Sequence, residues 1–311
     1  MRPAARHPFG EALGAAPAPG RALAWWLALR PWSFTLSLAP VLVGTSLAGL
    51  DGHAAQLGVA AAALLASMLI HAGTNLQNDV GDFRRGADGA GRIGPPRATT
   101  EGWLSAAQVQ AAATLCFAAA FIPGSYLVIK GGWPVVAIGL ASVAAGAIYT
   151  AGPRPVAYSG LGEAFVFVFF GLVAVGGIDY LHSGTLGAAA LIAGAALGSL
   201  ASAVLVVNNL RDIDSDRRTG KNTLAVRCGR RFTVIEYALL MHLPFALQIA
   251  LALHAGAIGL LAPLVLLPWA TRLTLKVRRE PAGEWLNGAL AATAKLGLSF
   301  ALLLSLGAGL A

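Results

Sequence analysis

Long apolar segments separated by polar stretches make up most of this chain. A helix that crosses a bilayer needs about 20 apolar residues. The segments that reach or approach this length are 32–50, 55–73, 106–129, 133–150, 161–181, 184–207, 233–253, 255–275 and 288–310. Small residues let helices approach closely in lipid, so the Ala and Gly runs in these segments fit a packed bundle. The pattern predicts an all-α integral membrane protein with about nine transmembrane helices.

The first residues follow a different pattern. Residues 1–21 contain Ala, Pro and Gly with a few Arg, and are predicted to form a disordered cytoplasmic tail. The next apolar patch, 22–29, is too short to span and is followed by Arg30-Pro31. It is predicted to lie at the membrane interface, with Trp25 and Trp26 at headgroup depth. Residues 22–311 are predicted to form a single transmembrane domain.

Composition supports the membrane assignment. The 311 residues are 57% hydrophobic and 12% charged, whereas a soluble domain has roughly 45–50% apolar and about 25% charged residues. The net charge of +8 could indicate nucleic acid, but in a membrane protein it more often reports basic cytoplasmic loops, so no nucleic-acid partner is expected. The two cysteines form no CxxC pair, so neither a disulfide framework nor a zinc site is indicated.

The distribution of basic residues predicts an orientation. With the N-terminus in the cytoplasm, the inner segments are 1–31, 74–105, 151–160, 208–232 and 276–287, together with Arg272. These hold all 22 Lys and Arg residues except Lys130 and Lys295, as the positive-inside rule requires. The two large inner loops follow the second and sixth segments. That spacing suggests a pseudo-repeat, with halves of about 30–150 and 151–311.

One of these loops carries an acidic motif. Asn208, Asp212 and Asp216 are spaced i, i+4, i+8, which on a helix is one face. Like charges so placed are favourable around a hard cation, since Mg²⁺ takes one or two carboxylates and completes its shell with water and phosphate. Asp214 lies off that face and is expected to be solvated or paired with an arginine. The alternative is a solvated helix end whose acids are neutralised by neighbouring arginines.

A second polar cluster ends the earlier segment. Asn78 and Asp82 are spaced i, i+4, with Asp88 further on, and Asn75 and Asp79 form another such pair one position round the helix. Asp79 is expected either to ligate or to cap. The run 83–97 is basic and glycine-rich, and could fold over a phosphate through bidentate arginine contacts. The alternative for each arginine is ordinary cytoplasmic charge.

Together the two clusters predict an anion site beside apolar walls. Acids and amides would hold two or more Mg²⁺ ions against a diphosphate, flanked by Arg and Lys. A substrate with a diphosphate head and a long hydrocarbon tail fits this combination, and the ions would stabilise the departing diphosphate. An allylic diphosphate would then ionise to a carbocation shielded from water.

At these residues the chain resembles the UbiA superfamily of intramembrane prenyltransferases, and more narrowly its MenA type, the 1,4-dihydroxy-2-naphthoate polyprenyltransferases. The resemblance runs from about Arg30 to the end. It is carried by both acidic motifs and by the runs 29–34, 75–97, 149–163, 208–227 and 286–287.

The resemblance implies helices around a central cavity, polar cap loops and an active site on the cytoplasmic side, and dependence on Mg²⁺. It implies that the metal ligands lie in both motifs, with Asp82 and Asp212 essential for catalysis. By position the ligands would be Asn78, Asp82, Asp88 and, where it ligates, Asp79 in the first motif, and Asn208, Asp212 and Asp216 in the second. The candidate diphosphate contacts are Arg84, Arg92, Arg97, Arg211 and Lys221. Asn75 and Arg30 are further candidates for substrate binding, with an ordinary helix-end role as the alternative for Arg30.

In the family reaction the aromatic ring attacks the prenyl cation at the carbon that bears the carboxylate, CO₂ is lost, and a demethylmenaquinone results. The implied partners are a polyprenyl diphosphate, dihydroxynaphthoate and membrane lipid, and the implied location is the bacterial inner membrane. Val80-Gly81 and Ser159 depart from the residues common in relatives, and both changes bear on the acceptor pocket. Other acceptors, such as 4-hydroxybenzoate or homogentisate, are therefore the alternative.

Several single residues keep two interpretations. Tyr149 and Tyr158 either orient or deprotonate the acceptor, or are interfacial tyrosines. Glu163 at a helix start is ordinarily a cap, with a catalytic role as the alternative. His71 is expected to pack, and Lys295 is an intramembrane base without a partner in sequence. A cation transporter is disfavoured because both acidic clusters lie at helix ends, whereas transport acids usually lie near mid-bilayer.

Overall fold

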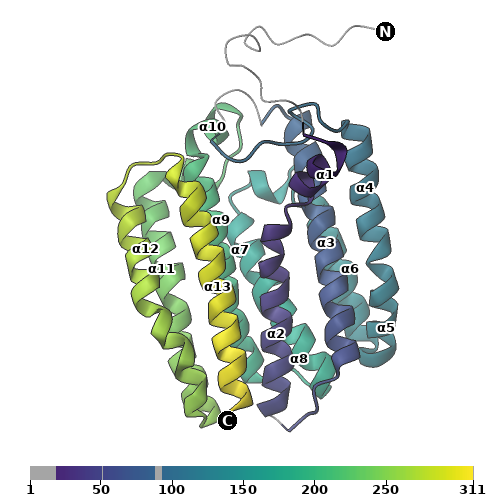
Figure 1. Ribbon diagram of the computed structural model, residues 1–311, viewed down its shortest axis with the longest axis vertical. Coiled ribbons are helices and arrows are strands. Elements are labelled where there is room, and N and C mark those ends of the chain that lie inside the picture. Colours follow the sequence, from purple (N-terminus) through teal and green to yellow (C-terminus); the bar gives the residue numbers. More distant parts are fainter. Residues whose placement is uncertain (1–18, 51, 88–92, 311) are drawn as a thin grey trace, which may run out of the picture.

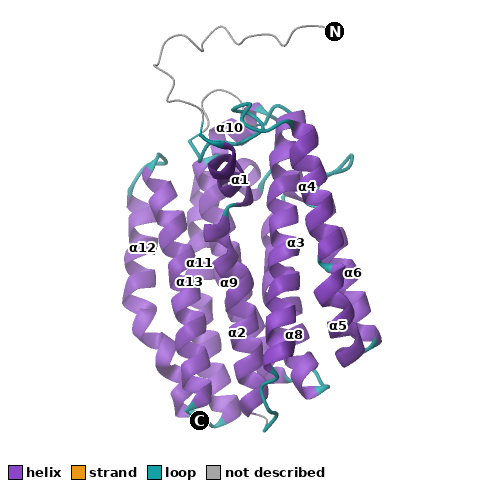
Figure 2. Cartoon of the chain, turned by 45° about the vertical axis from the view of Figure 1, so that its right-hand side comes forward, coloured by secondary structure: helices purple, strands orange, loops and turns teal. Residues whose placement is uncertain are grey.

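The computed structural model describes residues 19–50, 52–87 and 93–310. Most of the predicted tail, and the candidate residues Asp88 and Arg92, lie outside the described residues. Figures 1 and 2 show the described residues as helices joined by loops, with no strand among them. The elements are α1 (Arg21–Leu29), η1 (Pro31–Phe34), α2 (Thr35–Leu50), α3 (Leu57–Arg84), α4 (Ala106–Ala119), α5 (Phe121–Gly131), α6 (Trp133–Ile148), η2 (Val156–Tyr158), α7 (Gly162–Val166), η3 (Phe167–Val173), α8 (Ala174–Ser183), α9 (Ala188–Arg211), α10 (Ile213–Arg218), α11 (Leu224–Ala255), η4 (Ile258–Leu266), α12 (Leu267–Arg279) and α13 (Trp285–Gly309).

The predicted helix count is confirmed within this part of the chain. Eight helical stretches are long and apolar enough to cross a membrane, and α6 is a shorter apolar helix. The main difference is length at the polar ends. Helix α3 continues to Arg84, well past the predicted end at residue 73, because its polar residues Asn75 and Asp82 are buried against neighbouring elements. The first acidic motif therefore belongs to a helix and not to a loop.

The fifth span is irregular in its middle. Residues Phe167–Val173 form a π-helical segment between α7 and α8. It packs against α9, where a Cβ on Gly198 would lie 2.6 Å from the Phe167 carbonyl oxygen. Glycine is needed there because the two backbones are in direct contact, as is common where helices cross closely in membranes.

Helix α1 is set apart from α2 by Arg30. This residue has φ 54° and ψ 57°, a left-handed conformation that is uncommon for residues with a side chain. The turn directs α1 across the end of the bundle, beside α3 (Figure 2). Ala24 and Ala28 of α1 pack there with Leu76 and Val80 of α3.

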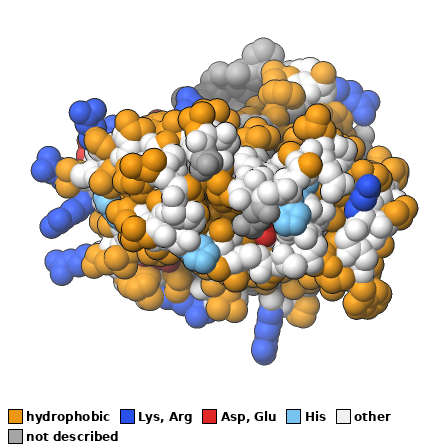
Figure 3. All heavy atoms as spheres, turned by 90° about the horizontal axis from the view of Figure 1, so that it is seen from below, with side chains coloured by type: hydrophobic (Ala, Val, Ile, Leu, Met, Phe, Trp, Pro, Cys, Tyr) orange, Lys and Arg blue, Asp and Glu red, His pale blue; other side chains and the backbone are white. Residues whose placement is uncertain are grey.

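Helix α9 is the most buried of the spans, and it contributes many residues to the largest core cluster, together with α2, α11 and α13. Helices α3 and α9 both end at the upper end of the bundle in Figure 1, where α10 follows α9. Figure 3 views the opposite end, where hydrophobic and uncharged groups cover most of the surface and blue Lys and Arg side chains lie mainly at the rim. The two acidic motifs thus share one end of the molecule.

Candidate active site

A cavity of about 1140 Å³ opens inside the bundle. Its walls come mainly from α2, α3, α5, α6, the α7–α8 span, α9 and α13, and most of the residues that line it are apolar. Polar side chains gather where α3 and α9 end, among them Asn78, Asp82, Arg97, Asn208 and Lys221. The cavity can therefore hold a hydrocarbon chain below a charged head group.

Asp82 is the residue on which this polar end converges. Its side chain is almost fully buried, and the Tyr158 hydroxyl donates a hydrogen bond of 2.8 Å to its Oδ1. Its Oδ2 lies 3.5 Å from Arg97 Nη2 and 3.9 Å from Lys221 Nζ. A buried carboxylate requires such partners, because an unpaired charge away from water is costly.

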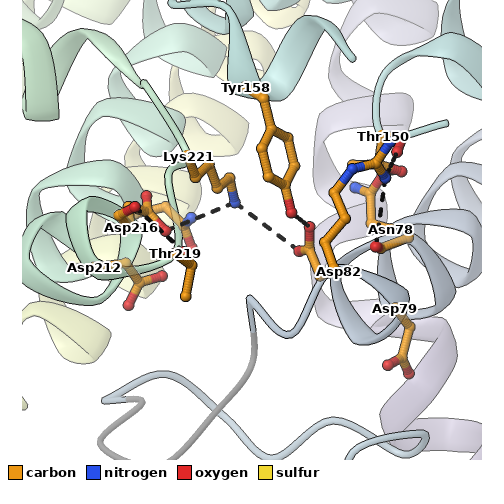
Figure 4. A network of polar contacts seen from close by, with 12 residues as sticks. Asn78, Asp79, Asp82, Thr150, Tyr158, Asp212, Asp216, Thr219 and Lys221 are labelled. Atoms are coloured by element: carbon orange, nitrogen blue, oxygen red, sulfur yellow. Dashed lines mark hydrogen bonds and ion pairs between the residues drawn. The ribbon is translucent and has the colours of Figure 1, made fainter. Parts of the chain in front are cut away.

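Lys221 connects the two acidic motifs. Its Nζ lies 3.9 Å from Asp216 Oδ1 as well as 3.9 Å from Asp82 Oδ2. Figure 4 shows Asp82 and Asn78 on one side of a gap and Asp212 and Asp216 on the other, with Lys221 reaching between them. The prediction that the fold brings the two motifs together is met for these residues.

A neighbouring contact involves an arginine that sequence reasoning missed. Arg85 donates to the carbonyl oxygens of Thr150 at 2.7 Å and Gly152 at 2.5 Å, and its guanidinium carbon lies 5.2 Å from the centre of the Tyr158 ring. The Thr150 hydroxyl in turn donates a hydrogen bond of 2.8 Å to Asn78 Oδ1. Arg84, the last residue of α3, has a different partner, because it donates a hydrogen bond of 3.3 Å to Gln110 of α4.

The second motif differs from its predicted geometry. Helix α9 ends at Arg211, and Asp212 is the junction before α10, so the three predicted ligands do not lie along one uninterrupted helix. Of the three, Asn208 lines the cavity, and Asp212 and Asp216 do not. Asp214 is exposed and pairs with Arg217 at 3.5 Å, as predicted.

Arg211 is buried and bound within its own motif. It donates to both carboxylate oxygens of Asp212, at 2.8 and 2.6 Å, and to Asn208 Oδ1 at 2.9 Å. Arg211 also donates a hydrogen bond of 2.9 Å to Asn287 Oδ1 of α13. Asn287 Nδ2 donates a hydrogen bond of 3.1 Å to the Ile93 carbonyl oxygen. Helix α13 therefore connects the second acidic motif to the loop that follows the first acidic motif.

Two predicted residues lie apart from this set. Asp79 is fully buried, its Oδ1 accepts a short hydrogen bond from Thr99, and Figure 4 shows its carboxylate directed away from Asp82. Asn75 lines the cavity, but its amide donates to the Leu29 carbonyl oxygen at 3.0 Å and to Ser33 Oγ at 3.1 Å. Both side chains fasten neighbouring segments to α3.

Tyr149 follows the last residue of α6, and its ring centre lies 5.9 Å from that of Phe165. A Cβ built on Gly162 would lie 3.3 Å from the Tyr149 hydroxyl, so this hydroxyl lies next to the start of α7. Tyr149 lines the cavity and stays a candidate for contact with the acceptor.

Three further candidates line the cavity wall. Arg30 and Lys295 both line the cavity. No hydrogen bond or ion pair is assigned to the Lys295 side chain within the described part of the chain. His71 also lines the cavity, 3.0 Å from Ser37 Oγ and 3.2 Å from Ser33 Oγ, between the rings of Phe34 and Phe170. The hydrogen bonds and ring contacts agree with the packing role expected of His71.

The donor chemistry at the gap fits a hard divalent cation. Carboxylate and amide oxygens of Asn78, Asp82, Asn208 and Asp216 gather there, and Mg²⁺ prefers oxygen ligands from few side chains supplemented by water and phosphate. Over residues 19–50, 52–87 and 93–310, no three His, Cys, Asp or Glu side chains group closely enough to hold a metal by themselves. A bound ion would complete its shell with amide, water or substrate oxygens.

Known proteins resemble this chain in sequence. The profile of the UbiA prenyltransferase family matches residues 37–296. The 1,4-dihydroxy-2-naphthoate octaprenyltransferase of Haemophilus influenzae is 35% identical over 246 residues, covering 73% of this chain and 78% of that protein. The enzyme of the same name from Escherichia coli is 40% identical over 215 residues, covering 67% of this chain and 70% of that protein.

A solved structure resembles it in fold. The UbiA homologue from Archaeoglobus fulgidus, bound to DMAPP and Mg²⁺, superposes with a TM-score of 0.66. The match covers 91% of this chain and 99% of that one, at 17% sequence identity. The helical architecture is therefore shared across a large divergence in sequence.

Proposed function

This chain belongs to the UbiA prenyltransferase family, and we propose that it transfers a polyprenyl group from an allylic diphosphate to 1,4-dihydroxy-2-naphthoate. The reaction releases diphosphate and CO₂ and forms a demethylmenaquinone in its reduced, quinol form. The names of the relatives support this acceptor. The reaction is a step of menaquinone synthesis.

The observation that carries the proposal is the convergence of both motifs on one end of an apolar cavity. Asp82 and Asp216 approach the same ammonium group, that of Lys221, at the mouth of the cavity. A prenyl diphosphate has the same division, with a charged head and an apolar tail. The head would lie between the motifs and the tail along the apolar walls.

Each residue of this polar end has a task that follows from its contacts. Lys221 and Arg97 would hold the diphosphate oxygens, because both are cations on the cavity lining. Tyr158 and Asp82 keep each other in place through their hydrogen bond. Asn78, Asp82, Asn208 and Asp216 would hold Mg²⁺, which when bound supplies positive charge to the leaving diphosphate. The apolar walls exclude water from the allylic cation.

The membrane setting follows from the same polarity. The helices make this an integral membrane protein. We place the polar end and the N-terminus in the cytoplasm, because the segments at that end hold nearly all Lys and Arg residues. Given its bacterial relatives, the location would be the inner membrane.

The test is product analysis with purified protein, Mg²⁺, a set of prenyl diphosphates and a panel of aromatic acceptors. Mass spectrometry should show a prenylated quinol from dihydroxynaphthoate with loss of CO₂, and chelation of divalent ions should abolish it. Asp82→Ala and Asp216→Ala should each remove activity while the protein still inserts. Product from 4-hydroxybenzoate or homogentisate alone would overturn the proposed acceptor, and full turnover in both variants would overturn the proposed site.

A further inference from the structure

A carboxylate that the proposed reaction has not yet used faces the cavity. Glu163, at the start of α7, lines the cavity wall and is only 6% exposed. Its Oε2 is buried and has no hydrogen-bond partner among the described residues. A buried acceptor left without a donor is unfavourable, so this oxygen is a place where a ligand hydroxyl would be favourable.

The other oxygen of the same carboxylate is firmly held. Asn209 of α9 donates 2.7 Å from Nδ2 to Glu163 Oε1, and both side chains are buried. This contact fixes the carboxylate orientation and leaves Oε2 as the atom with unused acceptor capacity. It also binds the side chain to a different helix.

Aromatic rings lie near the start of α7, where Glu163 is. A Cβ built on Gly162 would lie 3.3 Å from the Tyr149 hydroxyl, so this hydroxyl lies next to the start of α7. The Tyr149 and Phe165 ring centres are 5.9 Å apart, and Phe165 and Phe169 are 4.6 Å apart. All three rings line the cavity. They form an aromatic wall, the kind of surface on which a flat ring packs.

We propose that Glu163 and the aromatic wall of Tyr149, Phe165 and Phe169 form the subsite for the aromatic acceptor, with Glu163 Oε2 accepting a hydrogen bond from a ring hydroxyl. The inference rests on the proposed function, and it adds which chemical groups of the acceptor are recognised. The ligand class is a hydroxylated aromatic ring. A ring without a free hydroxyl would leave Oε2 unsatisfied.

The hydrogen bond would assist the reaction as well as binding. The prenyl C1–O bond breaks with its electron pair leaving on the diphosphate, and a ring carbon forms the new bond to C1. The bond from that ring carbon to the carboxylate then breaks, its electron pair returns to the ring, and CO₂ departs. The hydroxyl proton stays on the acceptor. Positive charge that develops on the hydroxyl oxygen strengthens its hydrogen bond to Glu163, which stabilises the transition state more than the bound substrate.

Glu163→Gln tests this with little change of shape. Because Asn209 donates to Oε1, the glutamine carbonyl will occupy that position and its NH₂ group will take the place of Oε2. An acceptor is thereby replaced by a donor. We expect the KM for dihydroxynaphthoate to rise about tenfold or more, with the KM for the prenyl diphosphate unchanged.

The decisive readout is discrimination between a hydroxyl and its methyl ether. A site built to bind a hydroxyl rejects analogues that lack it by large factors. The wild-type ratio of kcat/KM for dihydroxynaphthoate over its mono-O-methyl ethers should be about 100 or more for one of the two ethers, and should fall below about 10 in Glu163→Gln. A ratio and a KM equal to those of the wild type would overturn the inference.

The matched control is Glu236→Gln in α11. Glu236 also has a buried oxygen without a partner among the described residues, but it does not line the cavity. It should keep the wild-type ratio, and a fall equal to that of Glu163→Gln would also overturn the inference. If the wild type prenylates a different phenol instead, the proposed acceptor is wrong. The same ratio measured on that phenol and its ether then decides the role of Glu163 separately.

Discussion

Lys221 Nζ and Asp82 Oδ2 lie 3.9 Å apart, although one residue follows the sixth predicted span and the other ends the second. The same ammonium group lies 3.9 Å from Asp216 Oδ1. One cation therefore neutralises a buried carboxylate from each acidic motif. This contact occupies the place where a diphosphate would meet both motifs.

Removing that cation should weaken binding of the prenyl donor. In Lys221→Met the two carboxylates lose one neighbouring positive charge and repel an incoming diphosphate more strongly, and we expect its Kd to rise about tenfold or more. Lys221→Arg, which keeps the charge, should bind within a few fold of the wild type. Equilibrium binding of a non-hydrolysable prenyl diphosphate in detergent measures both. An unchanged Kd in Lys221→Met would contradict the assigned contact.

The two aspartates of α3 should respond differently to the same change. Asp82→Ala should lower kcat at least 100-fold, because Asp82 faces the cavity and the opposite motif. Asp79→Ala should retain most activity but lower the free energy of unfolding by about 1–3 kcal/mol, because it removes the buried carboxylate that accepts a hydrogen bond from Thr99. Turnover and thermal melting of both variants separate the two roles. Equal loss of kcat would place Asp79 in the metal site after all.

Arg84 and Arg85 form a second matched pair. Arg85→Gln removes the hydrogen bonds to the Thr150 and Gly152 carbonyl oxygens. It should lower stability by about 1–2 kcal/mol and reduce activity by loosening Tyr158. Arg84→Gln should stay near the wild type, since its contact with Gln110 is exposed. Activity and thermal melting of the two variants are measured in parallel. A larger activity loss in Arg84→Gln would contradict the assignment of the supporting role to Arg85.

Two glycine-to-alanine substitutions should differ sharply in their effect on stability. Gly198→Ala places a Cβ 2.6 Å from a backbone oxygen of the π-helical segment, and overpacking of this kind costs about 1–3 kcal/mol or more. Gly288→Ala in α13 meets nothing within 4 Å, and should be neutral or stabilising by up to about 1 kcal/mol. Melting temperatures in one detergent give the comparison. Equal melting of the two variants would show that α9 can move away from the fifth span.

Much of the architecture was predictable because hydropathy and length determine spanning helices. The spacing of Asn78 and Asp82 also placed both on one side of α3, as the structure has them. The break at Asp212 was not predictable from spacing, because the i, i+4 pattern assumes an unbroken helix. Nor was the Arg211 cluster: its partner Asn287 lies on the last helix, and such tertiary contacts leave no periodic signal in sequence.

Single residues at the site show the same limit. Tyr158 was a candidate by resemblance, but its partner Asp82 became evident only from the folded loop. Glu163 looked like an ordinary residue of a first helical turn, and its unused oxygen depends on Asn209 holding the other one. Helix ends were the weakest predictions, because polar residues that pack inside a bundle do not interrupt a helix.

The cavity is polar at one end and apolar along its length, and this asymmetry sorts the products of the reaction between two phases. The released diphosphate can leave only toward water, whereas the prenylated quinol is extracted by lipid. The amount of bilayer around each molecule then sets how strongly the quinol competes with fresh substrate. Turnover measured in a small micelle should therefore slow earlier than turnover in a large vesicle, where the accumulating quinol is diluted into more lipid.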